Sequence, residues 1–149
     1  KLKWKFSRGD ATTLAEFGDP TSTASYVICL YDASGAPQPL LSLAAPAGGT
    51  CNGLACWNLS GSGYRYKDKF LTPDGLSTAL LRAGLEDGKT QLQFQGKGGN
   101  LFLPAGLPLV VPLVVQVSNS ETGVCWQTTF SVVPIITTAN KVKLKAKND

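Results

Sequence analysis

The chain contains no histidine and no methionine among its 149 residues. Histidine is the commonest general base, so its absence removes the usual Ser-His and Cys-His catalytic arrangements. The acidic residues lie mostly in turn sequences, and no spacing among them selects the facing carboxylate pair that a glycosidase needs. We therefore expect no catalytic residues and no enzyme activity.

Long apolar runs are also missing. The longest apolar stretch, residues 107–117, is interrupted by Pro108, Pro112 and Gln116, and it is too short to cross a bilayer. The composition is 43% hydrophobic and 16% charged, which excludes wholesale disorder. We expect a single domain over residues 1–149 with no membrane span.

The absence of methionine includes the initiator, so we expect that an N-terminal segment has been removed. A secretory signal is the usual reason. The cysteines form an even set, as in disulfide-bonded secreted domains: Cys29, Cys51, Cys56 and Cys125. The expected location is secreted, either extracellular or at the cell surface.

Four cysteines allow three disulfide connectivities. Cys51 and Cys56 bracket a glycine-containing loop and can close a small ring, which leaves Cys29 to pair with Cys125. A structural zinc site normally uses two close pairs of thiolates, and only one close pair exists here. We therefore favour two disulfides, with no metal and no cofactor.

Short segments rich in β-branched and aromatic residues recur at roughly ten-residue spacing between turn sequences. The expected strands are residues 1–6, 24–31, 40–44, 64–70, 77–83, 90–95, 110–117, 124–133 and 141–147. A helix competes only at 76–85, where the apolar residues have a helical period. The pattern predicts an all-β fold, an antiparallel β-sandwich (Ig-like or jelly-roll-like) of about eight or nine strands, stapled by disulfides.

The two ends of the chain, residues 1–7 and 141–147, both alternate lysine with apolar residues. An amphipathic strand of this kind can complete its own sheet or be exchanged into that of a neighbouring subunit. The apolar side chains are Leu2, Trp4 and Phe6 at one end, and Val142 and Leu144, with Ala146, at the other. Larger side chains gain more on burial, so the N-terminal strand is the expected donor and Trp4 its anchor. The alternative is that the two ends pair with each other inside one domain.

Two ligand classes are weighed from the remaining side chains. Trp57, Tyr64 and Tyr66 could form a sugar-stacking surface, although large aromatic residues on strands more often pack into the core. The net charge of +4 invites a nucleic-acid interpretation. However, lysines on exposed strands commonly prevent unwanted sheet pairing, and no RNA-binding signature is present. We expect no nucleic-acid partner.

Four short motifs occur together in this chain: residues 29–32 (CLYD), 63–69 (GYRYKDK), 125–126 (CW) and 143–147 (KLKAK). In this combination the chain resembles a domain of secreted bacterial proteins for which no activity is known. The resemblance spans most of the chain and implies an exported bacterial origin. It transfers no catalytic residue.

These observations support two hypotheses about function. The first is an extracellular structural or self-assembling protein, a filament or surface-layer-type subunit joined to copies of itself by β-strand donation. The alternative is a secreted carbohydrate-binding or adhesion module that recognises a cell-surface glycan through its aromatic residues.

Overall fold

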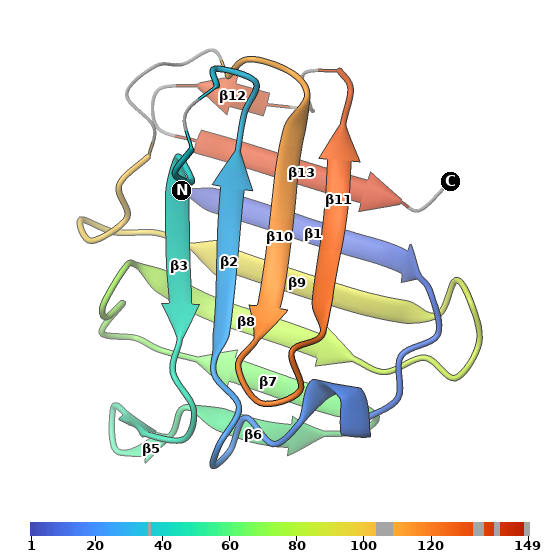
Figure 1. Cartoon of the computed structure of the whole chain (residues 1–149). Helices are drawn as coiled ribbons and strands as arrows, with labels where there is room; N and C mark the ends of the chain where they lie inside the picture. The colour runs from blue at the N-terminus through green and yellow to red at the C-terminus, as the bar shows by residue number, and fades with distance from the viewer. Residues whose placement is uncertain (36, 104–108, 133–135, 139–140, 148–149) are drawn as a thin grey trace.

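The computed structural model describes residues 1–35, 37–103, 109–132, 136–138 and 141–147 (Figure 1). Its strands are β1 (Leu2–Gly9), β2 (Tyr26–Tyr31), β3 (Leu41–Ala45), β4 (Thr50–Cys51), β5 (Leu54–Ala55), β6 (Trp57–Ser60), β7 (Gly63–Lys67), β8 (Leu76–Arg82), β9 (Thr90–Gly96), β10 (Leu113–Asn119), β11 (Cys125–Phe130), β12 (Ile136–Thr138) and β13 (Lys141–Lys147). One short 3-10 helix, η1 (Ala15–Phe17), is the only helical element in these ranges. The expected all-β fold is confirmed.

Two sheets pack face to face as a sandwich. The larger has the strand order β12-β13-β1-β9-β8-β7-β6, and the smaller has the order β11-β10-β2-β3. The strands of the small sheet cross those of the large sheet steeply (Figure 1). A two-stranded ribbon, β4-β5, lies at one end of the sandwich.

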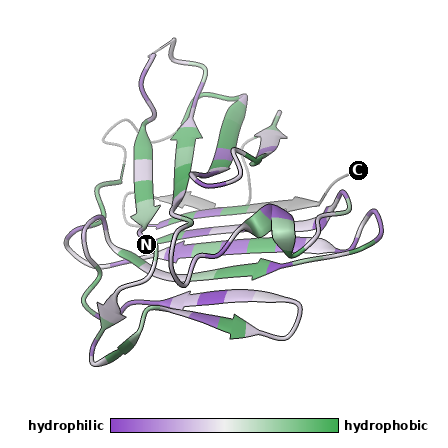
Figure 2. Cartoon of the chain, turned by 60° about the horizontal axis from the view of Figure 1, so that its bottom comes forward, coloured by the Kyte–Doolittle hydropathy of each residue, from purple (hydrophilic) through white to green (hydrophobic). Residues whose placement is uncertain are grey.

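Alternation of side chains along each strand determines which face of each sheet is buried. In β1, β2, β9 and β10 every second side chain is buried, as the two-residue period of a strand requires. The buried faces meet between the sheets and form one core. Hydrophobic residues dominate β2, β3 and β10 of the small sheet, whereas the large sheet also carries hydrophilic stretches (Figure 2).

The two expected hairpins are present. β8 pairs antiparallel with β9, and β10 pairs antiparallel with β11. Most of the segment 76–85 is therefore the strand β8 and not a helix. The reason is the turn that follows, where the Lys89 N–H donates to Glu86 O at 3.2 Å and returns the chain along β8.

Several expected boundaries are wrong. The strand expected over 64–70 ends at Lys67, because the Asp68 carboxylate accepts N–H bonds from Phe70 at 2.7 Å and Thr72 at 2.9 Å. The strand expected to begin at residue 110 begins at Leu113. The strand expected over 124–133 covers Cys125–Phe130, and Val133 lies outside the described residues. Short strands that lack a full alternating pattern, such as β4 and β5, raise the number of strands above the expected eight or nine.

A buried polar cluster fixes η1 against the small sheet. The Tyr26 hydroxyl donates to Phe17 O at 2.6 Å. The Asn119 side-chain amide donates to the same carbonyl at 2.7 Å and to the Tyr26 hydroxyl at 2.9 Å. Because all three residues are buried, these bonds satisfy groups that would otherwise be costly to remove from water.

Candidate functional site

The terminal strands lie inside their own domain. β1 pairs parallel with β13 on one side and antiparallel with β9 on the other. All five side chains that the sequence marked for assembly are buried, with exposed fractions of 4% or less: Leu2, Trp4, Phe6, Val142 and Leu144. The structure thus shows the arrangement in which the two ends pair with each other.

Trp4 joins the two sheets. Its ring stacks on Phe6 and tilts against Phe94 of β9, with centroids 6.0 Å apart in both pairs. Its indole N–H donates to Thr128 Oγ1, on β11 of the opposite sheet, at 3.2 Å. A side chain that is fully buried and hydrogen-bonded across the core is positioned to stabilise the monomer.

The three aromatic residues considered for glycan binding are core residues. Trp57 is 1% exposed, Tyr66 is 2% exposed and Tyr64 is 9% exposed. The Trp57 ring packs against Tyr66 at 5.1 Å and against Tyr26 at 5.7 Å. A sugar ring cannot stack on buried side chains, so these three residues belong to the core and not to a glycan-binding surface.

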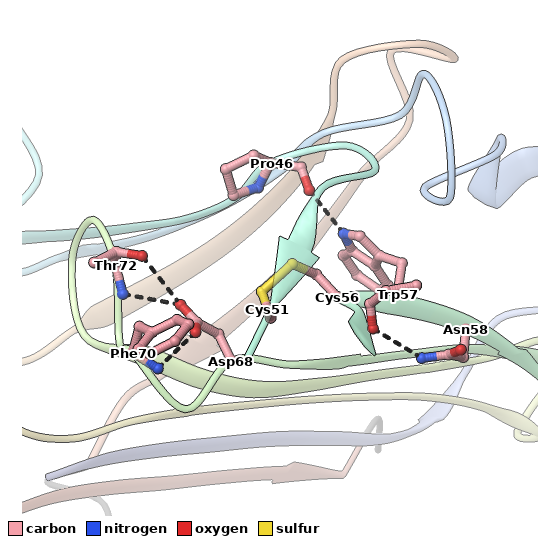
Figure 3. The surroundings of a disulfide bond; sticks show 9 residues. Pro46, Cys51, Cys56, Trp57, Asn58, Asp68, Phe70 and Thr72 are labelled. Atoms are coloured by element: carbon pink, nitrogen blue, oxygen red, sulfur yellow. Dashed lines mark hydrogen bonds between the residues drawn. A yellow bond between two sulfur atoms is a disulfide. The ribbon is translucent and has the colours of Figure 1, made fainter. Parts of the chain in front are cut away.

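One of the two favoured disulfides is present. Cys51 and Cys56 are bonded and close the ribbon β4-β5 (Figure 3). Beside this bond, the Trp57 indole N–H donates to Pro46 O at 2.9 Å, which ties the strand after the disulfide to the loop before it (Figure 3). The disulfide therefore belongs to the packing of this end of the sandwich.

The expected Cys29–Cys125 disulfide is wrong, because both thiols are free. Cys29 lies on β2 and Cys125 on β11, and β10 separates these two strands. Two inter-strand steps amount to about 9.5 Å, beyond the ~7 Å limit between Cα atoms that a disulfide tolerates. Partial desolvation and then the nearby Cys29 raise the pKa of the Cys125 thiol.

The acidic side chains serve local structure. Asp68 fixes the turn after β7, and the Asp74 carboxylate accepts the Ala44 N–H at 3.1 Å. Within the described ranges, no group of three or more His, Cys, Asp or Glu residues is placed to hold a metal ion. No helix in those ranges is long and apolar enough to span a membrane.

A different feature stands out at one edge of the small sheet. The Asn119 N–H donates to Val124 O at 3.1 Å, so the backbone groups of Val124 point toward β10. The backbone groups of every second residue after Val124 point toward β10 in the same way. The backbone groups of the intervening residues point to the outer side of β11, where no strand of the described chain pairs (Figure 1). We call this outer side the open edge, formed by Cys125, Gln127 and Thr129.

The open edge lacks the usual protection against pairing with another chain. Its three side chains are exposed and uncharged, and β11 contains no charged residue or proline. The opposite edge of the small sheet differs, because the Ala44 N–H on the outer side of β3 already donates a hydrogen bond to the Asp74 carboxylate. The edge strands of the large sheet are short, with four residues in β6 and three in β12. The open edge is thus the longest unprotected edge in the described chain.

Comparison of the chain with known protein families, with curated proteins and with solved structures finds no match. The site must therefore be judged from its own geometry.

The sequence did not reveal the open edge. The segment CWQTTF was expected to be a strand, but an edge strand and a central strand can share such a sequence. The one signal in the sequence was that this segment carries no charge. The strand order was needed to show that the segment is an edge strand with unpaired backbone groups.

Proposed function

We propose that the protein is an extracellular, non-catalytic structural subunit that associates with copies of itself by pairing β11 of one copy with β11 of a second. The observation that carries this proposal is the open edge. An unpaired strand edge attracts a further strand because its N–H and C=O groups are already aligned for ladder hydrogen bonds.

The open edge is complementary to itself in the antiparallel direction. A two-fold axis at Gln127 places Gln127 opposite its own symmetry mate and Cys125 opposite Thr129 of the second copy. Each opposed pair exchanges two N–H···O bonds, and the two small sheets become one continuous sheet. No charged side chain on β11 opposes this contact.

The contact differs from the strand donation expected from the sequence. In the proposed assembly the terminal strands stay in their own domain, where Trp4 and Leu144 are buried. A two-fold contact closes as a dimer, so growth into a filament would need a second contact. The Cys51–Cys56 disulfide supports the secreted, extracellular location of this assembly.

A charge placed on the open edge tests the proposal. Gln127→Lys puts two like charges opposite each other in the dimer, while the side chain remains exposed in the monomer. We expect wild type to sediment as a dimer at high concentration and Gln127→Lys to shift toward monomer.

The matched control is Gln116→Lys on β10. Gln116 is the register partner of Gln127 and donates to its side-chain oxygen at 2.8 Å, so it lies on the same face but one strand away from the edge. This variant should dimerise as wild type does. Equal loss in both variants would point to association through the sheet face, and a monomeric wild type at all concentrations would refute the proposal.

A further inference from the structure

The outer face of the seven-stranded sheet concentrates positive charge. Its basic side chains alternate with buried residues of the same strands and therefore point away from the core. We call this surface the basic face, formed by Lys3, Lys5, Arg65, Lys67, Arg82, Lys141 and Lys143. None of the seven strands contains an aspartate or glutamate.

The charges of the basic face have no counter-charge from the strands themselves. Lys3 lies directly opposite Lys143 in the β1–β13 register, a like-charge pair that is unfavourable without an anion nearby. Two strands, β9 and β8, lie between these lysines of β1 and β13 and the basic residues of β7. The side chains of Gln93 and Gln95 on β9 occupy part of this intervening surface. Their amides add neutral hydrogen-bond donors between the two rows of positive charge.

Two adjoining hollows of about 290 Å³ each open on this face. Both are lined by Lys67, Thr78 and Gln95, so they form one continuous depression. Lys69 and Lys97 add positive charge to the first hollow, and Arg65 adds it to the second.

One acidic residue, Asp68, borders the depression, but its carboxylate is already used. It accepts N–H bonds from Phe70 and Thr72 and the Thr72 hydroxyl bond at 3.3 Å, and the residue is 3% exposed (Figure 3). Its hydrogen-bonding capacity is therefore used within the turn, and its single negative charge is outnumbered by Lys67, Lys69 and Lys97 in the same lining. The lining favours an anion.

We infer that the basic face binds an acidic polysaccharide, a chain that carries repeated carboxylate or sulfate groups. The charge is spread over several strands as separate rows, which fits a polymer of anions better than one small anion. Hydroxyl groups of a sugar chain match the neutral amides of Gln93 and Gln95.

The burial of the aromatic residues favours a polysaccharide over a nucleic acid. Single-stranded nucleic acids bind through exposed aromatic rings on which bases stack. The aromatic residues of this sheet point into the core, with exposed fractions of 9% or less: Trp4, Phe6, Trp57, Tyr64, Tyr66 and Phe94. The basic face offers charge and hydrogen bonds without a stacking surface.

Binding can be measured on the full chain with heparin and polygalacturonate, and with dextran as the neutral polymer, at about 0.15 M salt. The test variant is Lys3→Gln/Lys67→Gln. It removes Lys67 from the lining of both hollows and Lys3 from β1, where Lys3 is the register partner of Gln95. The control is Arg8→Gln/Lys89→Gln, which also removes two positive charges. These residues lie at the other end of the sheet, where β1 ends and β9 begins. There, Gly88 N–H donates to Gly9 O at 2.9 Å, and the acidic Asp87 is adjacent.

We expect binding to both acidic polymers and none to dextran, with about tenfold weaker affinity in the test variant and little change in the control. Circular dichroism verifies that both variants are folded. Equal losses in the two variants, or no binding by wild type, would overturn the inference. Tighter binding to single-stranded DNA or to anionic lipid vesicles than to either polysaccharide would assign the face to another partner. The comparison between the two variants tests the basic face separately from self-association, because none of the substituted residues lies on β11.

Discussion

Trp4 and Leu144 come from opposite ends of the chain and are register partners in the parallel strands β1 and β13. Their side chains are 0% and 1% exposed. The first and last described strands are therefore adjacent in the large sheet, and β1 is held between β13 and β9. The two lysine-rich segments therefore pair with each other in one sheet.

Trp4→Ala should destabilise the monomer by about 3–5 kcal/mol, because it leaves a large cavity between the sheets. It also removes the indole donor to Thr128. Urea unfolding followed by circular dichroism measures the loss, and Leu59→Ala, at a residue 60% exposed, should change stability by less than about 0.5 kcal/mol. A Trp4→Ala domain that stays equally stable but assembles poorly would instead support donation of the N-terminal strand.

Cys51→Ser/Cys56→Ser should lose about 2 kcal/mol, the chain-entropy value for so short a loop. Cys29→Ser/Cys125→Ser should cost much less, because no bond joins these residues. Thermal unfolding compares the two variants with wild type. Mass spectrometry under non-reducing conditions should find two free thiols in the wild-type monomer, and a Cys29–Cys125 bond would contradict the strand order of the small sheet.

Stability should fall in alkaline solution through Tyr66. Burial, and then the negative charge of Asp68, raise the pKa of Tyr66 to about 12. An unfolded chain has a tyrosine pKa of about 10. The folded state thus holds the proton more tightly, so this contribution is complete below about pH 10 and is lost as the pH rises toward 12. Unfolding midpoints from pH 9 to 12 should fall less steeply in Tyr66→Phe, and parallel slopes in the two proteins would reject this role.

The sequence predicts the strands and much of the core, because alternation of side chains is a local property. The burial of Leu2, Trp4 and Phe6 follows from that alternation. Strand order is not local, and the features that depend on it could not be predicted. That β10 separates Cys29 from Cys125 is one such feature.

The basic face is a second feature of this kind. Lys3, Arg65 and Lys143 come from distant segments that share one surface only after β1, β7 and β13 enter the same sheet. Protection of a sheet edge does not explain the lysines of β1, because β1 is an interior strand. Neither surface could be recognised before the strand order was known.

Self-association should strengthen binding to long acidic polymers. In the proposed dimer each copy contributes one basic face, so one long polymer can contact both. Two linked sites gain about a hundredfold or more in apparent affinity when one polymer reaches both. Surface plasmon resonance with long and short heparin fragments measures this gain.

Gln127→Lys should lose most of the preference for the long fragment. Gln116→Lys, which adds the same charge and should still dimerise, should keep it. If Gln127→Lys keeps the preference for the long fragment, polymer binding does not depend on dimerisation. That result would contradict the binding of one polymer to both basic faces of a dimer.

The most direct test of the open edge is a cross-link in Thr129→Cys. In the proposed pair, residue 129 lies opposite Cys125 of the second copy, with Cα atoms about 5.5 Å apart, a separation that a disulfide accommodates. Within one chain the two positions are on the same strand, about 13 Å apart, and cannot be bridged. Mild oxidation should therefore yield a covalent dimer on a non-reducing gel, and the added change Cys125→Ser should abolish it. A Thr129→Cys protein that remains monomeric under the same oxidation would contradict the pairing of β11 with β11.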